Sequence, residues 1–375
     1  MSLPPPKSQL GSVAVIGGCG FLGHHIVKQL LEDDTVSSVA VMSRNPTANT
    51  FDGAFYRVGD ITSATDVERF LAEFKPTVII NTASPVAYID HEHAPEYERV
   101  NVGGNATLIA AARAAGTVRA YVYTSSGPII AAAGGAYAGA DESYPTLATL
   151  KGGDPYHIAK ARGDALVLGA NDTTPGGMRT ATIRPTAMYG EGDKQMVHNL
   201  LEVLRRQQQT VWLGDNTALM DSVYVGSVAK AHILAAHGLL AGAEDVSGAA
   251  PKVDGEAFNI TDDAPLQPWT FFRLFWIEMG DTTPLSRVWI VPSWLALLMS
   301  EIAEWWTWLF SFGKLRPKVL IKERIEFLLY TRTYDIRKAR ERLGYKPMLA
   351  MSEAVRRAVE WAVHEWPDPI VAKEM

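Results

Sequence analysis

A tyrosine and a lysine stand four residues apart in the run Tyr156-His-Ile-Ala-Lys160. Residues with this spacing share one face of a helix, so their side chains can meet. The pKa of an unperturbed tyrosine is about 10, which is too high for easy proton exchange at neutral pH. A lysine cation close by favours the phenolate and lowers that pKa. Such a tyrosine can take a proton from an alcohol while hydride leaves for a nicotinamide, or return the proton to a ketone.

The spacing of this pair is common on surface helices, so the pair alone is weak evidence for catalysis. Two further polar residues support that interpretation. Ser126 ends the run Thr124-Ser-Ser126 after an apolar strand, and it could hold a substrate oxygen beside Tyr156. Asn101 stands at the start of an expected helix, where it could support a water near the lysine. Simple capping of that helix is an equally weighted interpretation of Asn101.

Three glycines, Gly17, Gly20 and Gly23, follow a short apolar strand and open an expected helix. Their spacing, G-x-x-G-x-x-G, is one residue wider at the start than the commonest dinucleotide fingerprint. Glycines at such a turn let the backbone approach a pyrophosphate, and the amides at the helix start face its charge. The strand–loop–helix context favours a dinucleotide site over a purely structural turn.

The ends of the second and third strands bear on the choice of nucleotide. An acid after the second strand would bind the ribose 2′-hydroxyl, but the sequence has Ser43 followed by Arg44. An arginine suits a 2′-phosphate, so NADP is favoured over NAD; stacking of Arg44 on adenine is the alternative. Asp60 falls where a third strand would end and could accept from the adenine amino group. The alternative role of Asp60 is to cap the next helix, although Thr62 or Ser63 could be that cap instead.

Apolar strands alternate with helical segments through the first half of the chain. This pattern predicts an α/β fold: a Rossmann-type doubly wound parallel sheet with a smaller C-terminal substrate-binding lobe. Residues 1–190 are expected to form the dinucleotide-binding domain, to which residues 215–240 return, and residues 191–375 mainly form the lobe. The segments 130–140 and 171–177 are expected to be loops. Strands are expected at 13–16, 39–42, 77–80, 120–123 and 180–183, and helices at 21–31, 64–74 and 101–115.

The composition excludes several classes of protein. The chain has 375 residues, of which 47% are apolar and 20% charged, so global disorder is excluded. A net charge of −6 argues against a nucleic-acid partner. One cysteine, Cys19, excludes a disulfide scaffold and a cysteine-based zinc site. His157, His198 and His232 lack ligand spacing, so no metal is expected. Residues 1–9 lack the apolar core of a signal peptide, which predicts a cytosolic face and a reduced thiol.

Ten tryptophans are present, and five of them lie between Trp289 and Trp308. The segment 288–312 is dominated by apolar and aromatic residues, and a helix is expected between Pro292 and Gly313. Glu301 and Glu304 would be costly at the centre of a bilayer, so a position in the membrane interface is favoured over a simple span. The basic stretch 314–324 that follows would favour anionic lipid. The alternative is a helical lid or packed subdomain over the substrate pocket.

The ordered set of motifs resembles an extended short-chain dehydrogenase/reductase. Within that group it is similar to the 3β-hydroxysteroid dehydrogenase and sterol-4α-carboxylate 3-dehydrogenase (decarboxylating) family. The likeness covers nearly the whole chain, and the set is far more specific than the Tyr-Lys pair alone. Besides the glycine loop, Asp60 and the segment 156–160, it includes the segments 81–85, 100–105, 123–126, 183–193, 221–232, 257–262, 334–339 and 343–347.

The resemblance implies roles for individual residues. Tyr156 would be the acid/base, Lys160 would tune it and hold the nicotinamide ribose, and Ser126 would orient the substrate oxygen. Many relatives carry an acid where this chain has Ser43, and the loop 131–139 carries little side-chain information about the substrate mouth. The expected cofactor contacts are Gly17, Gly20, Phe21, Leu22, Gly23, Ser43, Arg44, Asp60, Ile61, Thr82, Ala83, Ser84, Asn101, Thr124, Tyr156, Lys160 and Pro185.

The function expected from this resemblance is NAD(P)-dependent oxidation of the 3β-hydroxyl of a steroid or terpenoid to the ketone. A 4-carboxylate, where present, would leave as CO₂ from the resulting β-keto acid without further catalytic groups. Two alternatives stay open: a reductase of flavonoid-like or other aromatic ketones, and a non-catalytic cofactor-sensing binding protein. The expected partners are an apolar small molecule, no nucleic acid, and a membrane surface contacted through 288–324. A homodimer is one option for the assembly, and the expected location is the cytoplasmic face with peripheral attachment to the endoplasmic reticulum.

Overall fold

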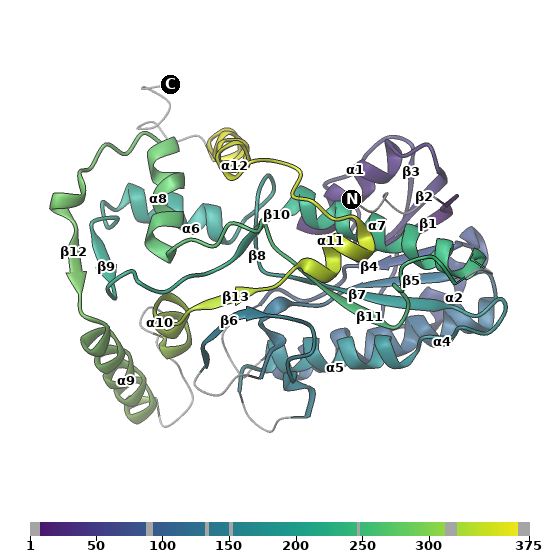
Figure 1. Ribbon diagram of the computed structural model, residues 1–375, viewed down its shortest axis with the longest axis horizontal. Helices are drawn as coiled ribbons and strands as arrows, with labels where there is room; N and C mark the ends of the chain where they lie inside the picture. The colour runs from purple at the N-terminus through teal and green to yellow at the C-terminus, as the bar shows by residue number, and fades with distance from the viewer. Residues whose placement is uncertain are drawn as a thin grey trace.

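Seven parallel strands form the central sheet, in the order β11-β7-β5-β4-β1-β2-β3 (Figure 1). The computed structural model describes residues 8–87, 93–131, 135–149, 153–245, 248–311 and 321–366. Most of the N-terminal segment 1–9 and of the basic stretch 314–324 therefore lies outside the described residues. The strands of the sheet are β1 (Gly11–Ile16), β2 (Val36–Ser43), β3 (Ala54–Val58), β4 (Val78–Asn81), β5 (Ala120–Thr124), β7 (Arg179–Pro185) and β11 (Glu256–Ile260).

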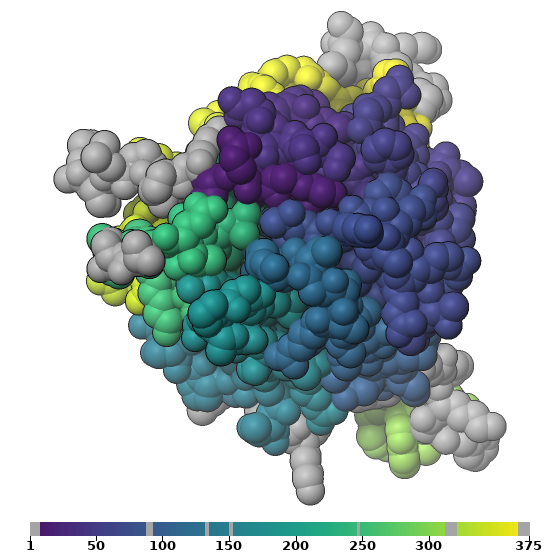
Figure 2. All heavy atoms as spheres, turned by 90° about the vertical axis from the view of Figure 1, so that its right-hand side faces the viewer, coloured from purple at the N-terminus to yellow at the C-terminus, as the bar shows by residue number. Residues whose placement is uncertain are grey.

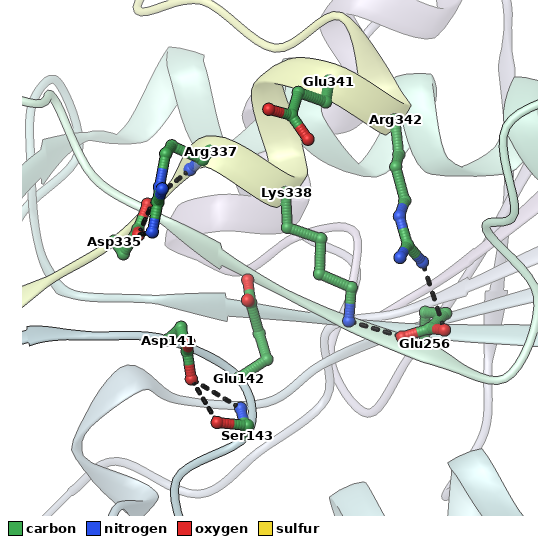
Figure 3. Close-up of a pocket in the computed structure, with 9 residues that line it drawn as sticks. All are labelled: Asp141, Glu142, Ser143, Glu256, Asp335, Arg337, Lys338, Glu341 and Arg342. Carbon is green, nitrogen blue, oxygen red and sulfur yellow. Dashed lines mark hydrogen bonds and ion pairs between the residues drawn. The ribbon is translucent and has the colours of Figure 1, made fainter.

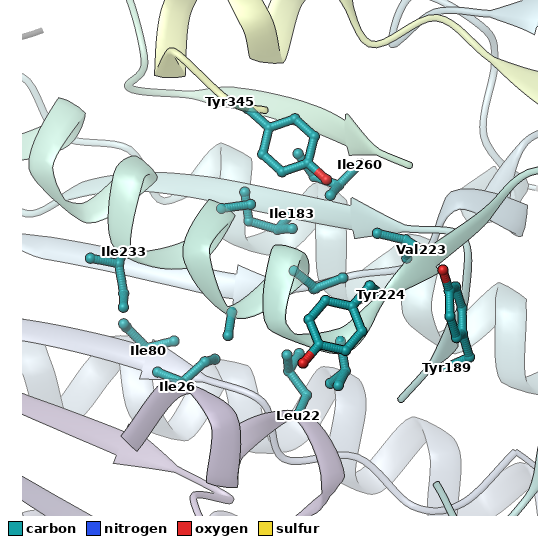
Figure 4. Close-up of a cluster of buried hydrophobic side chains, with 14 of the residues drawn as sticks. Leu22, Ile26, Ile80, Ile183, Tyr189, Val223, Tyr224, Ile233, Ile260 and Tyr345 are labelled. Atoms are coloured by element: carbon teal, nitrogen blue, oxygen red, sulfur yellow. The ribbon is translucent and has the colours of Figure 1, made fainter. Parts of the chain in front are cut away.

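Helices cover both faces of this sheet, which is why its inner strands are apolar on both sides. On one face lie α1 (Phe21–Leu31) and α7 (Val225–Glu244), and on the other lie α2 (Ala64–Phe74), α4 (Asn105–Ala115) and α5 (Pro155–Gly169). Figure 4 shows the hydrophobic core between the sheet and the pair α1 and α7, where Leu22 and Ile26 of α1 approach Ile80 of β4 and Ile233 of α7. Full burial of one such aliphatic side chain is worth about 1.5–3 kcal/mol. The expected doubly wound α/β fold is confirmed.

The direction of winding reverses between β1 and β4. From β1 the chain runs outward to β2 and β3, and it then returns to form β4 on the other side of β1. Ligands of such sheets bind in the crevice at this switch point, beyond the carboxyl ends of the strands. Here the loop after β1 meets the loop after β4, since the amide of Thr82 donates to the carbonyl of Ile16 at 2.9 Å.

Most of the remaining elements lie beyond the carboxyl ends of the strands, where β7 continues through Thr186 into β8, while α11 (Arg337–Leu343) packs against α7 and β11 (Figure 1). They include three small parallel pairs, β8 with β10, β9 with β12 and β6 with β13. Their bounds are β6 (Tyr137–Ala140), β8 (Ala187–Tyr189), α6 (Met196–Arg205), β9 (Val211–Leu213), β10 (Ser222–Tyr224), α8 (Pro268–Glu278), β12 (Trp289–Val291), α9 (Ser293–Phe310), α10 (Lys322–Leu329), β13 (Arg332–Tyr334), α11 (Arg337–Leu343) and α12 (Met351–Glu365).

Several strands lie where the sequence pattern indicated none, and β6 and β11 are two of them. The segment 130–140, expected to be a loop, contains β6, because residues of the distant β13 pair with it. No strand was expected after residue 183, yet β11 is the seventh strand of the sheet and pairs with β7. Both strands are defined by pairing between remote segments, which a local pattern of residues does not reveal.

The helix expected at 101–115 begins earlier than its sequence indicates. A continuous helical segment runs from α3 (Ala94–Tyr97) through a π-helical turn (Glu98–Gly104) into α4. Asn101 therefore lies inside the helix and not at its start, so the capping interpretation of this residue is wrong. The wider π-turn lets the helix continue through Gly103 and Gly104, where the sequence suggested a beginning.

Candidate active site

The start of α5 brings together the tyrosine and the lysine. Asp154 caps the helix by accepting hydrogen bonds from the amides of Tyr156 and His157, and Pro155 occupies the first helical position. The side chains of Tyr156 and Lys160 then lie one turn apart, with the Lys160 Nζ 5.9 Å from the centre of the Tyr156 ring. The expected helix and its shared face are confirmed.

Lys160 is almost fully buried, with 2% of its surface exposed. Its Nζ donates to the carbonyl of Thr124 at 2.9 Å and lies 5.0 Å from the centre of the Tyr123 ring. Burial of the ammonium lowers the pKa of Lys160 to about 7, and the negative charge of Asp164 acts in the opposite direction. The amine therefore changes its charge near neutral pH.

The pKa of Tyr156 differs from the expectation that the lysine lowers it. Burial raises this pKa to about 12; a hydrogen bond with Ser84 opposes the rise, and the charge of Asp154 adds to it. The reason is that the phenolate would lose its hydration at this buried position, and this cost outweighs the hydrogen bond that favours it. The hydroxyl of Tyr156 is therefore held protonated in this state of the site.

An ion pair that the sequence analysis did not identify fixes α5 against the sheet. The guanidinium of Arg184 in β7 forms two hydrogen bonds with the Asp164 carboxylate, Nε–Oδ1 at 3.2 Å and Nη2–Oδ2 at 2.6 Å. Both side chains are at most 5% exposed. Removing one partner of such a pair leaves a buried charge alone, which is strongly destabilising. Asp164 follows Lys160 by four residues, and that spacing is the one local signal for its role.

Thr124 connects the lysine to a buried histidine. Its hydroxyl lies 2.7 Å from Nε2 of His232, whose Nδ1 lies 2.8 Å from the carbonyl of Val228. A carbonyl can only accept, so Nδ1 carries the proton and Nε2 accepts from the Thr124 hydroxyl. Burial lowers the pKa of His232 to about 4, so the ring is neutral. Both ring nitrogens of His232 therefore have hydrogen-bond partners in the protein. In the parts of the chain that the structure describes, no group of side chains has the arrangement of a metal site.

The two serines after β5 have different surroundings. Ser126 is half-buried and precedes a short turn (Gly127–Ile129). Ser125 is buried, and its hydroxyl has no hydrogen-bond partner among the described residues. Ser126 is the more accessible of the two, which agrees with its expected contact to a substrate oxygen.

A groove runs over the carboxyl ends of β1, β2 and β4, with a volume of about 200 Å³. Gly17 has φ of +81°, and a Cβ there would lie 2.9 Å from the amide of Ala83, so only glycine fits the turn. Helix α1 has no side-chain cap at Gly20 and no acid in its first turn, which leaves its amides open to an anion. These features fit a dinucleotide. Nine of the expected cofactor contacts line the groove: Gly17, Gly20, Ser43, Arg44, Asp60, Ile61, Thr82, Ala83 and Ser84.

Other expected cofactor contacts are not among the residues that line the groove. Leu22 packs in the hydrophobic core with 5% of its surface exposed, and a Cβ on Gly23 would meet the carbonyl of Gly17 at 2.3 Å. Asn101 is fully buried, and neither polar atom of its side chain has a partner among the described residues. The others are the half-buried Phe21 and the buried Thr124 and Pro185. Residues that line the groove without having been expected to are Ile16, Met42, Gly59, Pro85 and Val100.

Arg44 and Asp60 line the part of this groove that follows β2 and β3. The Arg44 side chain is 67% exposed, with its Nη1 3.9 Å from Oε1 of Glu96. The Oδ1 atom of Asp60 accepts from both the amide and the hydroxyl of Thr62 at 2.8 Å. The cap of α2 is Ser63, which accepts from the amide of Asp66, so capping does not account for Asp60.

A larger cavity of about 960 Å³ opens beside the start of α5. Its volume lies within the size range of pockets for drug-sized ligands. Its walls come from the start of α5 and from segments that are far from α5 in the sequence. Asp154 and His157 line it from α5. Other lining residues are Pro128, Ile130, Ala131, Gly135, Tyr137, Leu147, Gln195, Met196, Asn199, Glu323, Arg324, Glu326, Phe327, Leu328 and Arg332.

A third depression, of about 460 Å³, lies around α11 and is lined by charged side chains (Figure 3). Its charges are largely neutralised by each other. Glu256 pairs with Lys338 and with Arg342, the latter at 3.1 Å, and Arg337 pairs with Asp335 at 2.6 Å. We therefore assign it no ligand.

Helix α9 carries a large apolar surface. Only Ala296 and Ser300 are buried on it, while Trp294, Trp305 and Trp308 are 66%, 57% and 60% exposed. In Figure 2 the segment coloured for residues near 300 protrudes beyond the outline of the sheet domain. Among the described residues, no helix combines the length and the apolar character that crossing a bilayer requires.

Comparison with known proteins adds curated relatives that match almost the whole chain. The sterol-4-alpha-carboxylate 3-dehydrogenase, decarboxylating, of Schizosaccharomyces pombe is 34% identical over 94% of this chain and 97% of its own length. A 3-beta-hydroxysteroid dehydrogenase of Mycolicibacterium neoaurum is 31% identical over 95% of this chain and 92% of its own length.

Solved structures with lower identity share the fold. The UDP-glucose 4-epimerase of Thermus thermophilus in complex with NAD aligns with a TM-score of 0.65 and 20% identity, over 93% of this chain and 98% of that one. A family model described as the 3-beta hydroxysteroid dehydrogenase/isomerase family matches residues 14–290. Together with the Tyr156–Lys160 helix and the nucleotide groove, these matches show that the chain belongs to the 3-beta hydroxysteroid dehydrogenase/isomerase family.

Proposed function

We propose that the protein is an NAD(P)-dependent dehydrogenase that oxidises the 3β-hydroxyl of a sterol carrying a 4-carboxylate, with loss of that carboxylate. The observation that carries the proposal is the position of Tyr156. It is hydrogen-bonded to Ser84 of the nucleotide groove, and its neighbours Asp154 and His157 line the large cavity. An acid/base residue thus stands where a dinucleotide and an extended apolar substrate would meet. The sterol dehydrogenase relatives support this choice of substrate.

The residues around Tyr156 would divide the work as follows. A bound nicotinamide supplies the acceptor for the hydride that leaves C3. Tyr156 accepts the proton of the 3-hydroxyl, and Ser126 orients that oxygen by a hydrogen bond. Lys160 stabilises the phenolate once its ammonium is turned from the Thr124 carbonyl toward the tyrosine. The groove residues, from Gly17 to Ser84, hold the nucleotide and keep water from the reacting carbon.

A substrate panel tests this function. We expect reduction of the nicotinamide, followed by its absorbance, with 3β-hydroxysteroids, and release of CO₂ with 4-carboxylated sterols. Aromatic ketones are expected not to oxidise the reduced cofactor at a comparable rate. Turnover of aromatic ketones without turnover of any sterol would support the alternative reductase, and nucleotide binding without turnover of either class would support a cofactor-sensing protein.

We also propose that the enzyme prefers NADP to NAD. Ser43 lacks the charge that would repel a 2′-phosphate, and the exposed guanidinium of Arg44 lines the same groove. We expect Arg44→Ala to lower kcat/KM for NADP about tenfold or more while kcat/KM for NAD changes little, because a charge-assisted contact is lost only with the phosphate. Arg57→Ala, on the neighbouring β3, is the matched control. An unchanged ratio of the two values in Arg44→Ala would remove this residue from cofactor selection.

We also propose that the protein attaches peripherally to a membrane through α9. The two acids of α9 are turned to α10: Glu301 pairs with Lys322 Nζ at 2.9 Å, and Glu304 accepts from the Lys322 amide at 2.9 Å. This arrangement leaves the tryptophans on the outer surface, where they suit the headgroup boundary of a membrane.

Vesicle sedimentation measures this attachment. We expect the double variant Trp305→Ser, Trp308→Ser to reduce binding to anionic vesicles at least tenfold, since each buried aromatic ring contributes about 1.5–3 kcal/mol. Phe55→Ser is the matched control, because Phe55 is a comparably exposed ring on β3. Equal binding by the wild type and the double variant would exclude α9 as the contact.

A further inference from the structure

We propose that His157 is a second proton-transfer residue, which delivers the proton to C4 after the carboxylate has left, with Asp154 as its positioning residue. The inference rests on the proposed function, since it concerns the 3-keto-4-carboxylate that oxidation would form. No role of His157 followed from the sequence, and loss of CO₂ was expected to need no further catalytic group.

The geometry at the start of α5 makes His157 and Asp154 a dyad. The Asp154 Oδ2 accepts from the His157 amide at 3.3 Å and pairs with Nδ1 of the His157 ring. A carboxylate on Nδ1 holds that proton in place and orients the ring, which leaves Nε2 as the atom that exchanges protons. Across the ranges that the structure describes, no hydrogen bond engages Nε2. One end of the ring is therefore fixed and the other is available.

The His157 ring also lies close to Tyr156 and to the large cavity. Its centre lies 5.1 Å from the centre of the Tyr156 ring, at an interplanar angle of 80°. His157 and Asp154 both line the 960 Å³ cavity, and the His157 side chain is 29% exposed. C4 is bonded to C3, so a substrate whose C3 oxygen is held by Tyr156 brings C4 to the neighbouring side chains. His157 is the proton donor adjacent to Tyr156 on the cavity wall.

The step that this dyad would perform is balanced without any added reagent. The bond between C4 and the carboxylate carbon breaks, CO₂ leaves, and the electron pair forms the C3–C4 double bond of an enolate on the C3 oxygen. Tyr156, protonated after the oxidation, donates a hydrogen bond to that oxygen. The C3 carbonyl then re-forms as C4 takes the proton from His157 Nε2, and solvent entering the cavity reprotonates the ring.

Other ionisable groups line the same cavity and are the competing donors. Glu323 and Arg324 are exposed on α10, while Glu326 on α10 and Arg332 on β13 are half-buried. Glu326 is the competing acid with comparable burial. His157 is favoured over it because the dyad belongs to the same helix as Tyr156, which fixes the two proton-transfer groups relative to each other.

Proton exchange at C4 tests the inference apart from hydride transfer. A saturated 3-ketosteroid is incubated in D₂O with the full-length enzyme and oxidised cofactor, and deuterium at C4 is followed by NMR. We expect the wild type to label one face of C4. His157→Gln, which can still bond to Asp154, should lower the exchange rate at least ten times more than it lowers oxidation of a 3β-hydroxysteroid without a 4-carboxylate. Asp154→Asn, which keeps the helix cap, should lower exchange less than His157→Gln does.

The controls separate the possible failures. His364→Gln, an exposed histidine on α12, should match the wild type in both assays, and the thermal midpoint of each variant shows that it is folded. Exchange that persists in His157→Gln, or that is lost in Glu326→Gln instead, would overturn the role of His157. A wild type that oxidises 3β-hydroxysteroids without any exchange at C4 would also overturn it. No oxidation of any 3β-hydroxysteroid would contradict the proposed function itself.

Discussion

Tyr156→Phe is expected to lower turnover of a 3β-hydroxysteroid by about 1,000-fold, which is within the range that a positioned acid/base residue contributes. The change removes one oxygen atom and keeps the ring, which packs edge-on against Tyr97 with the ring centres 5.4 Å apart. The hydroxyl contacts Ser84 at the edge of the nucleotide groove and is not part of its glycine turn. Affinity for the nucleotide should therefore change by less than about threefold.

Steady-state kinetics and nucleotide titration of the same preparation check this expectation. Tyr97→Phe is the matched control, since it removes the hydroxyl of the ring that packs against Tyr156, and that hydroxyl donates to the carbonyl of Val86. Turnover by Tyr156→Phe at the wild-type rate would show that another group exchanges the proton. Loss of nucleotide binding together with turnover would instead assign the tyrosine a structural role.

Those features of the site that are local in sequence could be predicted. The glycine loop and the helix 21–31 were placed where the structure has them, because a strand, a turn and an amphipathic helix are patterns of adjacent residues. Tyr156 and Lys160 share a helix, so their spacing was sufficient to bring them together. The doubly wound parallel sheet was expected from the alternation of strands and helices, which is also a pattern of adjacent segments.

The missing features depend on contacts between remote segments. The pair of Arg184 and Asp164, and the bond between Thr124 and His232, join residues 20 and 108 positions apart. The pKa of Tyr156 was expected to fall and instead rises, because burial of the whole Tyr–Lys pair is a property of the packed helix and not of the motif. Asn101 was misplaced because a π-turn leaves no distinctive mark in the residues that form it.

Lys160→Met is expected to make the enzyme less active and more stable at the same time. Turnover should fall by about 100-fold or more, because the cation that stabilises the phenolate is lost. Burial holds the pKa of Lys160 at about 7 instead of 10.5, and a unit of pKa is worth about 1.4 kcal/mol. Keeping the ammonium charged inside the fold therefore costs on the order of 5 kcal/mol. Methionine has a similar length and no charge, and the donor that it removes from the Thr124 carbonyl costs about 1–3 kcal/mol.

The titration of Lys160 determines how the stability gained by Lys160→Met changes with pH. A lysine whose pKa is lower in the folded state binds fewer protons there than in the unfolded chain between pH 7 and pH 10.5, so the stability of the wild type rises with pH across that window. Below pH 7 both states are protonated and the full cost applies. The gain in unfolding free energy on Lys160→Met, roughly 2 kcal/mol, should therefore be largest at pH 6, fall by about 1.4 kcal/mol per pH unit above pH 7, and become a loss by pH 10. Denaturant unfolding of both proteins at pH 6, 8 and 10 measures it, with Lys230→Met, at a half-buried lysine of α7, as the control. A gain that is constant across these pH values would mean that Lys160 does not titrate inside the fold, and its charge would then be fully available to Tyr156 throughout.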